Sequence, residues 1–156
     1  MFPVKQATTQ KELEAILALR YKILRQPWNQ SFESATDGSE AGNVNAFIED
    51  LNGTVIACGR LQENENKIGQ VRFMAVDDAY QGKGLGKLIL KFLEEKGRVM
   101  QLQKIELHAR ENALAFYESA GYKHKEISYK LWGIIQHYLM VKVLDYARTN
   151  NPELEK

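Results

Sequence analysis

The first quarter of the chain changes from a strand-like to a helix-like pattern. Apolar and polar residues alternate over residues 2–7, which is typical of a short strand. Thr9 and Glu12 then have the spacing of a capping box, in which each residue satisfies a backbone N–H group of the other at a helix start. We therefore expect a helix after Thr9 that ends at Pro27 and carries one apolar stripe, formed by Leu13, Ile16, Leu17, Tyr21 and Leu24.

Residues 28–43 (WNQSFESATDGSEAGN) are mostly polar and show no period. A loop of this length is usually functional or mobile, so we treat it as a candidate lid over a substrate. Its aromatic residues, Trp28 and Phe32, either line an acceptor pocket or pack the loop. Its acidic residues would attract a cationic amine if the loop folds over the cleft; they are Glu33, Asp37 and Glu40.

The pattern next predicts an antiparallel meander of three strands. The first two, 44–51 and 54–61, are joined by Asn52-Gly53, a pair that supplies the two positive φ angles of a tight hairpin turn. A second turn over 63–67 leads into the third strand, 69–76.

The second half alternates helical and strand patterns. Apolar residues recur at helical spacing from Leu85 to about Met100, so a helix begins inside a glycine-rich loop. A strand over 104–109, a helix over 112–120 that Gly121 stops, and strands over 122–131 and 134–143 complete the order. We expect one α/β (α+β) domain over 1–145 and a frayed polar tail over 146–156.

Composition narrows the class of protein. A chain of 156 residues that is 44% hydrophobic fits one core, and 21 basic against 20 acidic residues give no broad field for nucleic acid or membrane. The single cysteine, Cys58, excludes an internal disulfide and should be a buried small apolar residue, and no Cys/His spacing suggests a metal site. Without a signal-like leader or a long apolar run, we expect a cytoplasmic protein.

The glycine-rich loop, 80–87 (YQGKGLGK), carries the most specific chemistry. A strand that feeds a glycine loop and then a helix start presents free N–H groups and the positive end of the helix dipole, which favours a phosphate or pyrophosphate. Lys83 and Lys87 add positive charge. The P-loop pattern fails, because Gln81 and Leu88 occupy its first glycine and its hydroxyl position. The dinucleotide fingerprint fails because the spacing is G-x-G-x-G.

Two motifs in this half resemble those of the GNAT superfamily of acyl-CoA-dependent N-acyltransferases. Residues 81–86 (QGKGLG), between the strand 71–76 and an amphipathic helix, are similar to its Q/R-x-x-G-x-G/A pyrophosphate loop. Residues 112–122 (NALAFYESAGY) are similar to its A-x-x-x-Y-x-x-x-G-F/Y segment. Residues 133–140 (GIIQHYLM) resemble the Gly-Ile-Pro-His segment of the ElaA-like branch, with two residues in place of the proline.

The resemblance implies a fold and a cosubstrate. The fold is a mixed, mostly antiparallel sheet of about six to seven strands with about four helices, splayed between the strand that ends near Val76 and the strand 104–109. The cosubstrate is acetyl-CoA, with no metal. Backbone groups of the first of these strands would bind the pantetheine arm, and main-chain N–H groups of the loop would hold the pyrophosphate. These residues are Met74, Ala75 and Val76, followed by Gln81, Gly82, Lys83, Gly84, Leu85, Gly86 and Lys87.

The second motif implies further roles. Tyr117 would protonate the coenzyme A thiolate, and Asn112 and Phe116 would contact the cosubstrate. Many family members carry asparagine seven places before the tyrosine, where this chain has Arg110.

Acetyl transfer to an amine also needs a base and a polarised thioester carbonyl. A backbone N–H near Val76 could polarise the carbonyl. The base stays open among Glu106 and His108, which share one face of their strand, and His137 on the last strand. Arg72, in an apolar strand, fits an edge charge and a substrate-site group equally well.

The leading hypothesis is therefore an enzyme that transfers an acetyl group from acetyl-CoA to a primary amine of a small molecule or peptide, by direct attack in a ternary complex. The alternative is a non-catalytic acyl-CoA-binding module or sensor. The sequence leaves open the acceptor, the acyl length and the oligomeric state, for which a strand-mediated homodimer is one candidate.

Overall fold

The computed structural model describes residues 2–146, so the expected tail over 146–156 lies outside the described residues except for its first residue. Its strands are β1 (Lys5–Gln6), β2 (Val44–Glu49), β3 (Val55–Glu63), β4 (Ile68–Val76), β5 (Lys104–Arg110), β6 (Lys123–Leu131) and β7 (Ile135–Val143). Its α-helices are α1 (Gln10–Arg20), α2 (Leu85–Val99) and α3 (Leu114–Ser119). None of the helices within 2–146 is long and apolar enough to cross a membrane.

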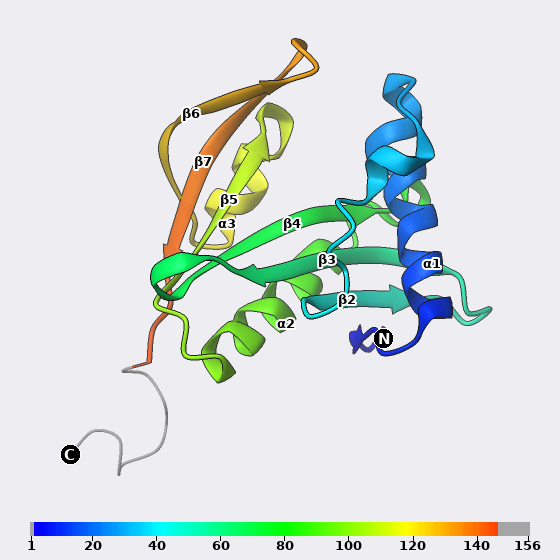
Figure 1. Cartoon of the computed structure of the whole chain (residues 1–156), viewed down its shortest axis with the longest axis horizontal. Coiled ribbons are helices and arrows are strands. Elements are labelled where there is room, and N and C mark those ends of the chain that lie inside the picture. Colours follow the sequence, from blue (N-terminus) through cyan, green and yellow to red (C-terminus); the bar gives the residue numbers. More distant parts are fainter. Residues whose placement is uncertain (1, 147–156) are drawn as a thin grey trace.

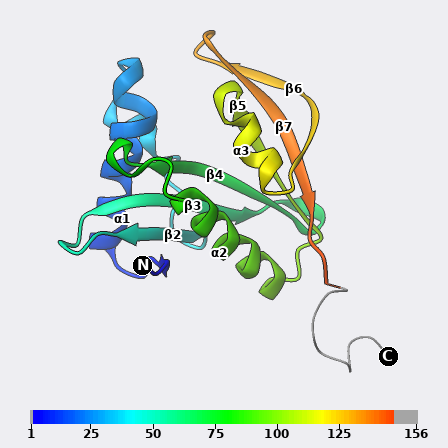
Figure 2. The same cartoon turned by 180° about the vertical axis from the view of Figure 1, so that it is seen from behind.

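The strands form one seven-stranded sheet in the order β1-β2-β3-β4-β5-β7-β6 (Figure 1). Every neighbouring pair is antiparallel except β4 and β5, which are parallel. The predicted mixed sheet is confirmed, with three α-helices in the described part where about four were expected. Seen from behind, β5, β6 and β7 rise away from the plane of β2, β3 and β4 (Figure 2).

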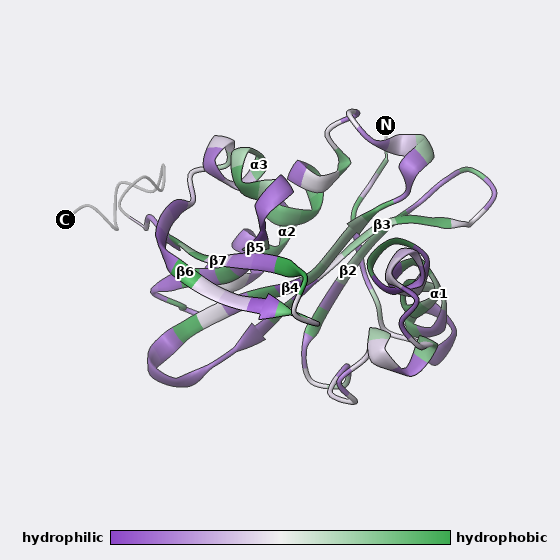
Figure 3. Ribbon diagram, turned by 90° about the horizontal axis from the view of Figure 1, so that it is seen from above, coloured by the Kyte–Doolittle hydropathy of each residue, from purple (hydrophilic) through white to green (hydrophobic). Residues whose placement is uncertain are grey.

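The helices cover opposite faces of the sheet, with α1 on one face and α2 and α3 on the other (Figure 3). Ile16 and Leu19 of α1 pack with Phe47 and Cys58, whereas α2 packs on the larger core cluster. Gly59 permits that second contact, because a Cβ at Gly59 would lie 2.5 Å from the Met74 sulfur and 2.8 Å from Ile89.

The predicted start of the first helix is confirmed, since Thr9 and Glu12 form a complete capping box. The predicted apolar stripe is partly wrong, because α1 buries Ile16 and Leu19 while Leu13 and Leu17 stay half-buried. The helix also does not run unchanged to Pro27: it widens into a π-turn over Tyr21–Arg25 and ends in a 3-10 turn over Gln26–Trp28. Arg25, the last residue of this π-turn, lines the cleft beside β4.

The hairpin prediction is correct for the strands and wrong for the turn. Only Gly53 has a positive φ at the predicted turn, where the Asp50 carboxylate accepts from the N–H groups of Asn52 and Thr54 and widens the loop. The two consecutive positive φ angles occur in the next turn instead, at Asn66 and Lys67. The strands of the second half lie within one residue of their predicted bounds at each end.

Candidate active site

The open part of the sheet lies between β4 and β5. These strands pair only from Ile68 with Lys104 to Gln70 with Glu106, and beyond that point they diverge. The Asp77 N–H bonds the Ile56 carbonyl in β3, so the neighbouring Val76 turns its own N–H and C=O toward the gap. One edge of β4 can therefore hydrogen-bond an extended chain that enters the gap.

The glycine loop ends at the N-terminus of α2. Gly82 and Gly84 have φ of +75° and +80°, and a Cβ at either position would meet nothing within 4 Å. The helix has no side-chain cap, and none of the backbone N–H groups from Gly82 to Lys87 donates to an acceptor in the part of the chain that the structure describes. Six free donors at a helix start fit a pyrophosphate.

The other residues of the loop motif have separate structural roles. The Gln81 side chain donates to the Val76 carbonyl at 3.0 Å and ties the loop to the end of β4. Gly86 is buried, and a Cβ there would lie 3.1 Å from the ring of Phe116. This third glycine therefore serves the packing of α2 against α3 rather than the shape of the loop.

A β-bulge interrupts β4 where the strands diverge. Between Cys58 and Arg60, β3 has one residue and β4 has two, and Phe73 takes a φ of +56°. Such a φ is uncommon for a bulky residue and holds only where the surroundings enforce it. The bulge also interrupts the β3–β4 ladder at Phe73, whose carbonyl accepts from the Cys58 thiol.

The gap opens into a cleft that crosses the sheet. It is lined from the first helical segment, β4, β5, α3 and the β6–β7 hairpin by Leu24, Arg25, Gln70, Val71, Arg72, Phe73, Met74, Leu107, His108, Ala109, Arg110, Ala113, Tyr117, Tyr129, Leu131 and His137. Of the predicted residues, the structure thus brings together Met74, Tyr117, His108, His137 and Arg72. Glu106 lies at the last β4–β5 pair and Asn112 in an exposed turn, and neither lines the cleft.

Tyr117 reaches the cleft from α3. It is 7% exposed and packs edge-on against Phe116 and Tyr122, with ring centroids 4.9 and 5.9 Å away. Its hydroxyl makes no hydrogen bond within residues 2–146. Burial raises the pKa of Tyr117 far above its usual value, so the hydroxyl keeps its proton and can donate it.

The two cleft histidines are both neutral near pH 7. Burial lowers the pKa of His108, and the nearby charge of Glu106 partly offsets that effect. Burial likewise lowers the pKa of His137. His137 Nδ1 lies 3.0 Å from the Ile135 carbonyl, which can only accept, so Nδ1 carries the proton and Nε2 is the basic nitrogen. His108 Nδ1 lies 2.5 Å from the Ser128 hydroxyl.

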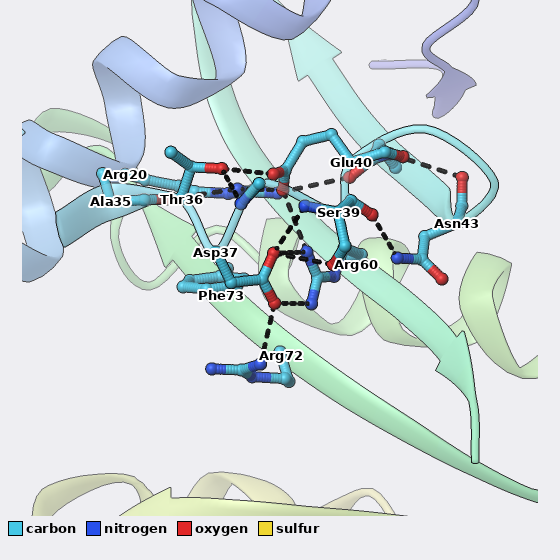
Figure 4. A network of polar contacts seen from close by, with 12 residues as sticks. Arg20, Ala35, Thr36, Asp37, Ser39, Glu40, Asn43, Arg60, Arg72 and Phe73 are labelled. Carbon is cyan, nitrogen blue, oxygen red and sulfur yellow. Dashed lines mark hydrogen bonds and ion pairs between the residues drawn. The ribbon is translucent and has the colours of Figure 1, made fainter. Parts of the chain in front are cut away.

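Two of the three acidic residues of the 28–43 loop, Asp37 and Glu40, are engaged in an ion network with the buried side chains of Arg20 and Arg60 (Figure 4). Glu40 lies 2.6 Å from Arg20 and 3.0 Å from Arg60, and Asp37 bonds both terminal nitrogens of Arg60 and also Arg72. The expectation that Asp37 and Glu40 attract a cationic amine is therefore wrong, because arginines already balance their charges.

The arginines of the same ion network surround the side chain of Phe73, the residue with positive φ at the bulge. The guanidinium carbons of Arg20, Arg72 and Arg60 lie 4.4, 4.7 and 5.0 Å from the centroid of the Phe73 ring. Cation–π contacts of this kind fix the ring and with it the strained backbone of Phe73. The 28–43 loop is in this way part of the support of β4.

Several cleft residues could not be predicted from the sequence. Arg25 belongs to the π-turn and Phe73 to the bulge, two irregularities that the sequence pattern does not indicate. Tyr129, stacked on His137 at 4.5 Å, comes from a strand with little periodicity. Trp28 and Phe32, the expected pocket aromatics, are 40% and 47% exposed and lie outside the cleft lining.

Comparisons with known proteins agree with this geometry. The sequence profile described as "Acetyltransferase (GNAT) family" matches residues 13–122, well over half of the chain. The chain belongs to this family. GNAT acetyltransferases use acetyl-CoA as cosubstrate for acyl transfer to an amine. Among the described residues of this GNAT protein, no three His, Cys, Asp or Glu side chains gather as a metal site.

Named relatives are distant. A glucosamine 6-phosphate N-acetyltransferase from Arabidopsis thaliana is 25% identical over 122 residues, which is 74% of this chain and 82% of that one. The ribosomal-protein-S18-alanine N-acetyltransferase from Escherichia coli has a TM-score of 0.75 at 22% identity, covering 96% and 98% of the two chains. Escherichia coli ElaA has a TM-score of 0.78 at 17% identity, covering 91% and 99%. These two structural likenesses show the fold alone.

Proposed function

We propose that this GNAT protein transfers an acetyl group from acetyl-CoA to a primary amine of a small molecule or peptide, by direct attack in a ternary complex. The observation that carries the proposal is the cleft between β4 and β5, which holds a buried protonated tyrosine and two neutral histidines. An acid and a base in one cleft are what acyl transfer from a thioester to an amine requires.

Acetyl-CoA would be held by the parts of the chain that have unused backbone donors. The free N–H groups from Gly82 to Lys87 would bind the pyrophosphate, and the edge of β4 at Val76 would bind the pantetheine arm. Bound in this way, the cosubstrate supplies an activated acetyl thioester. A backbone N–H of β4 near Val76 faces the same gap and would polarise the thioester carbonyl.

Different side chains of the cleft would then carry out the two proton transfers, one to the departing sulfur and one from the amine. Tyr117 donates a proton to the departing sulfur, because burial keeps its hydroxyl protonated and no described residue competes for it. His137 or His108 takes the proton of the amine, directly or through a water molecule. Glu106, outside the cleft lining, acts on this step through its charge on His108.

The relatives support the reaction without identifying the acceptor. Their names include glucosamine 6-phosphate and amino-acid acetyltransferases, and the second of these, from Mycobacterium tuberculosis, is 39% identical over only 56 residues. Both names describe acetylation of a compound that carries an amino group, which agrees with the proposal.

An amine panel tests the proposal. The purified chain is incubated with acetyl-CoA and amines that include sugars, amino acids, polyamines and peptides, and thiol release and acetylated product are measured together. We expect at least one amine to be acetylated in proportion to released coenzyme A. If calorimetry shows coenzyme A binding while no amine is acetylated, the protein is a binding module and the enzymatic proposal is wrong.

A further inference from the structure

The lining of the cleft has a one-sided charge. Three arginines, Arg25, Arg72 and Arg110, carry this charge, since the two lining histidines are neutral and no aspartate or glutamate is among the lining residues. The whole chain has a net charge of only +1, so this concentration of positive groups is local. It faces the place where an acceptor must approach the acetyl group.

Two of these arginines lack a counter-charge. Arg72 pairs with Asp37 at 3.0 Å, but neither Arg25 nor Arg110 makes an ion pair with any residue in the described part of the chain. Arg25 donates to the carbonyls of Ser34 and Leu24, and Arg110 donates to the same Leu24 carbonyl. These acceptors are neutral, so the charge of both guanidiniums stays uncompensated.

Their surroundings make that charge costly. Both side chains are half-buried, and Arg25 lies over the rings of Trp132 and Phe73, at 5.2 and 5.9 Å. Burial first, and then repulsion from Arg110, lower the pKa of Arg25, although a guanidinium remains protonated at neutral pH. Partly desolvated like charges that converge on one cleft favour an anion between them.

Free donors remain to bind that anion. Arg25 uses Nε and Nη1, which leaves Nη2, and Arg110 uses Nη2, which leaves Nε and Nη1. A carboxylate or phosphate matches such paired N–H groups in geometry and charge. None of the loop residues from Gly82 to Lys87 lines the cleft, and α2, which this loop begins, covers the opposite face of the sheet from α1 (Figure 3), so we assign this anion to the acceptor and not to the pyrophosphate.

We propose that the acceptor amine carries an anionic group, a carboxylate or a phosphate, that Arg25 and Arg110 bind. The inference rests on the proposed acetyl transfer and specifies its substrate class. It reverses the cationic acceptor expected from the acidic loop, because Asp37 and Glu40 pair with arginines, whereas Arg25 and Arg110 in the cleft have no acidic partner among the described residues.

Matched acceptor pairs test the inference. Phenylalanine is compared with phenylalaninamide, and glucosamine 6-phosphate with glucosamine, with spermidine as a cationic acceptor; kcat/KM is corrected for the fraction of free amine. We expect the anionic member of at least one pair to be preferred tenfold or more over its neutral partner. The pair that shows the preference tells whether the bound group is a carboxylate or a phosphate.

Substitutions test whether Arg25 and Arg110 cause the preference for an anionic acceptor. In Arg25→Gln and Arg110→Gln the anionic-to-neutral ratio should fall at least tenfold, and Arg110→Lys, which keeps the charge, should restore part of it. Arg98→Gln on α2, which removes an arginine that pairs with Glu95 outside the cleft lining, should leave the ratio unchanged. Thermal unfolding of each variant verifies that it is folded.

The outcomes separate the two proposals. Transfer to neutral or cationic amines as fast as to anionic ones, or an anionic preference that both Gln variants retain, overturns the inference and leaves acetyl transfer in place. The absence of transfer to every amine of the panel overturns the proposed function itself and the inference with it.

Discussion

Burial sets the protonation of the cleft's titratable side chains one residue at a time. It raises the pKa of the Tyr117 hydroxyl and lowers the pKa of the imidazoles of His108 and His137, so all three groups are neutral at pH 7. A neutral phenol donates a proton and a neutral imidazole accepts one. The same physical effect thus leaves all three groups in the protonation states that the proposed acid and base roles require.

Removal of the Tyr117 hydroxyl tests the acid role. We expect Tyr117→Phe to lower kcat by about 10²- to 10⁴-fold, the range of general acid catalysis, with little change in the affinity for coenzyme A. Steady-state kinetics and calorimetry measure the two effects. Tyr122→Phe is the matched control: it removes a buried hydroxyl that bonds Glu94 outside the cleft, so stability should fall while kcat stays the same. A Tyr117→Phe enzyme with full kcat contradicts the assignment.

The protonation state of His137 can be observed directly. Because its Nδ1 faces the Ile135 carbonyl and burial lowers its pKa, we expect the Nδ1–H tautomer at pH 7 and titration below pH 6.5. Long-range ¹H–¹⁵N NMR correlations distinguish the two ring nitrogens and follow the titration. A proton on Nε2 at pH 7, or a midpoint above 6.5, would remove His137 from the candidate bases.

At the scale of elements, the glycine loop depends on two positive φ angles before α2. Gly84→Ala should lower stability by about 1 kcal/mol through its left-handed backbone, and also weaken coenzyme A binding about tenfold by disturbing the free N–H groups. Gly53→Ala is a matched control, since its φ is also +80° and its Cβ also meets open space, but it lies in the β2–β3 turn. Calorimetry with coenzyme A and chemical denaturation separate the two effects. Equal affinity in both variants would mean that the loop does not hold the cosubstrate.

The elements themselves could be predicted well because local chemistry determines them. Two helix starts depend on interactions within a few residues, and both were predicted correctly: the capping box of Thr9 and Glu12, and the glycine start of α2. The conformation of the β2–β3 turn was predicted wrongly, because the Asp50 carboxylate accepts from two of its backbone N–H groups. The π-turn and the bulge at Phe73 arise from tertiary packing, and neither has a local signal.

The residues of the candidate site likewise fall into two groups, those with a local sequence signal and those that only tertiary packing brings to the cleft. Tyr117 and the glycine loop carry motifs, and the alternation of β5 places His108 on one face of its strand. Arg25, by contrast, belongs to the π-turn, and its lack of an acidic partner is visible only once Asp37 and Glu40 are seen to bind other arginines. The net charge of a chain can be counted from its sequence. Which of its charged side chains form ion pairs depends on the fold.

For the molecule as a whole, one ion network joins the first helix, the 28–43 loop and the open sheet. Arg20 and Arg60 are fully buried, and their Nε atoms have no hydrogen-bond partner in the described part of the chain. Buried pairs of this kind add little net stability, but removal of one partner leaves a buried charge and typically costs about 3–5 kcal/mol. The network therefore acts mainly by fixing one arrangement of loop, Phe73 and cleft.

This arrangement should make the protein sensitive to acid. Hydrogen bonds from Arg60 hold the pKa of Asp37 far below its usual value, and bonds from Thr36 and Arg20 lower the pKa of Glu40 despite its burial. Carboxylates whose folded pKa is depressed stabilise the fold fully above their unfolded pKa, near 4, and lose that contribution as the pH falls through the folded value. Stability should hence be constant near neutrality and decrease below about pH 4 to 5.

Asp37→Asn isolates this contribution. At pH 7 we expect the variant to be less stable than the natural chain by about 1 kcal/mol, because it loses charged hydrogen bonds to Arg60 at a partly exposed site. The difference should shrink as the pH falls from about 4 to 3, because the unfolded chain then binds a proton at Asp37 while the folded chain keeps this carboxylate ionised. Urea denaturation at pH 7, 5, 4 and 3 measures it, with Glu118→Gln, an exposed α3 residue that makes no ion pair within residues 2–146, as the control. A difference that stays constant or grows toward pH 3 would show that the Asp37 charge does not hold the loop to the sheet.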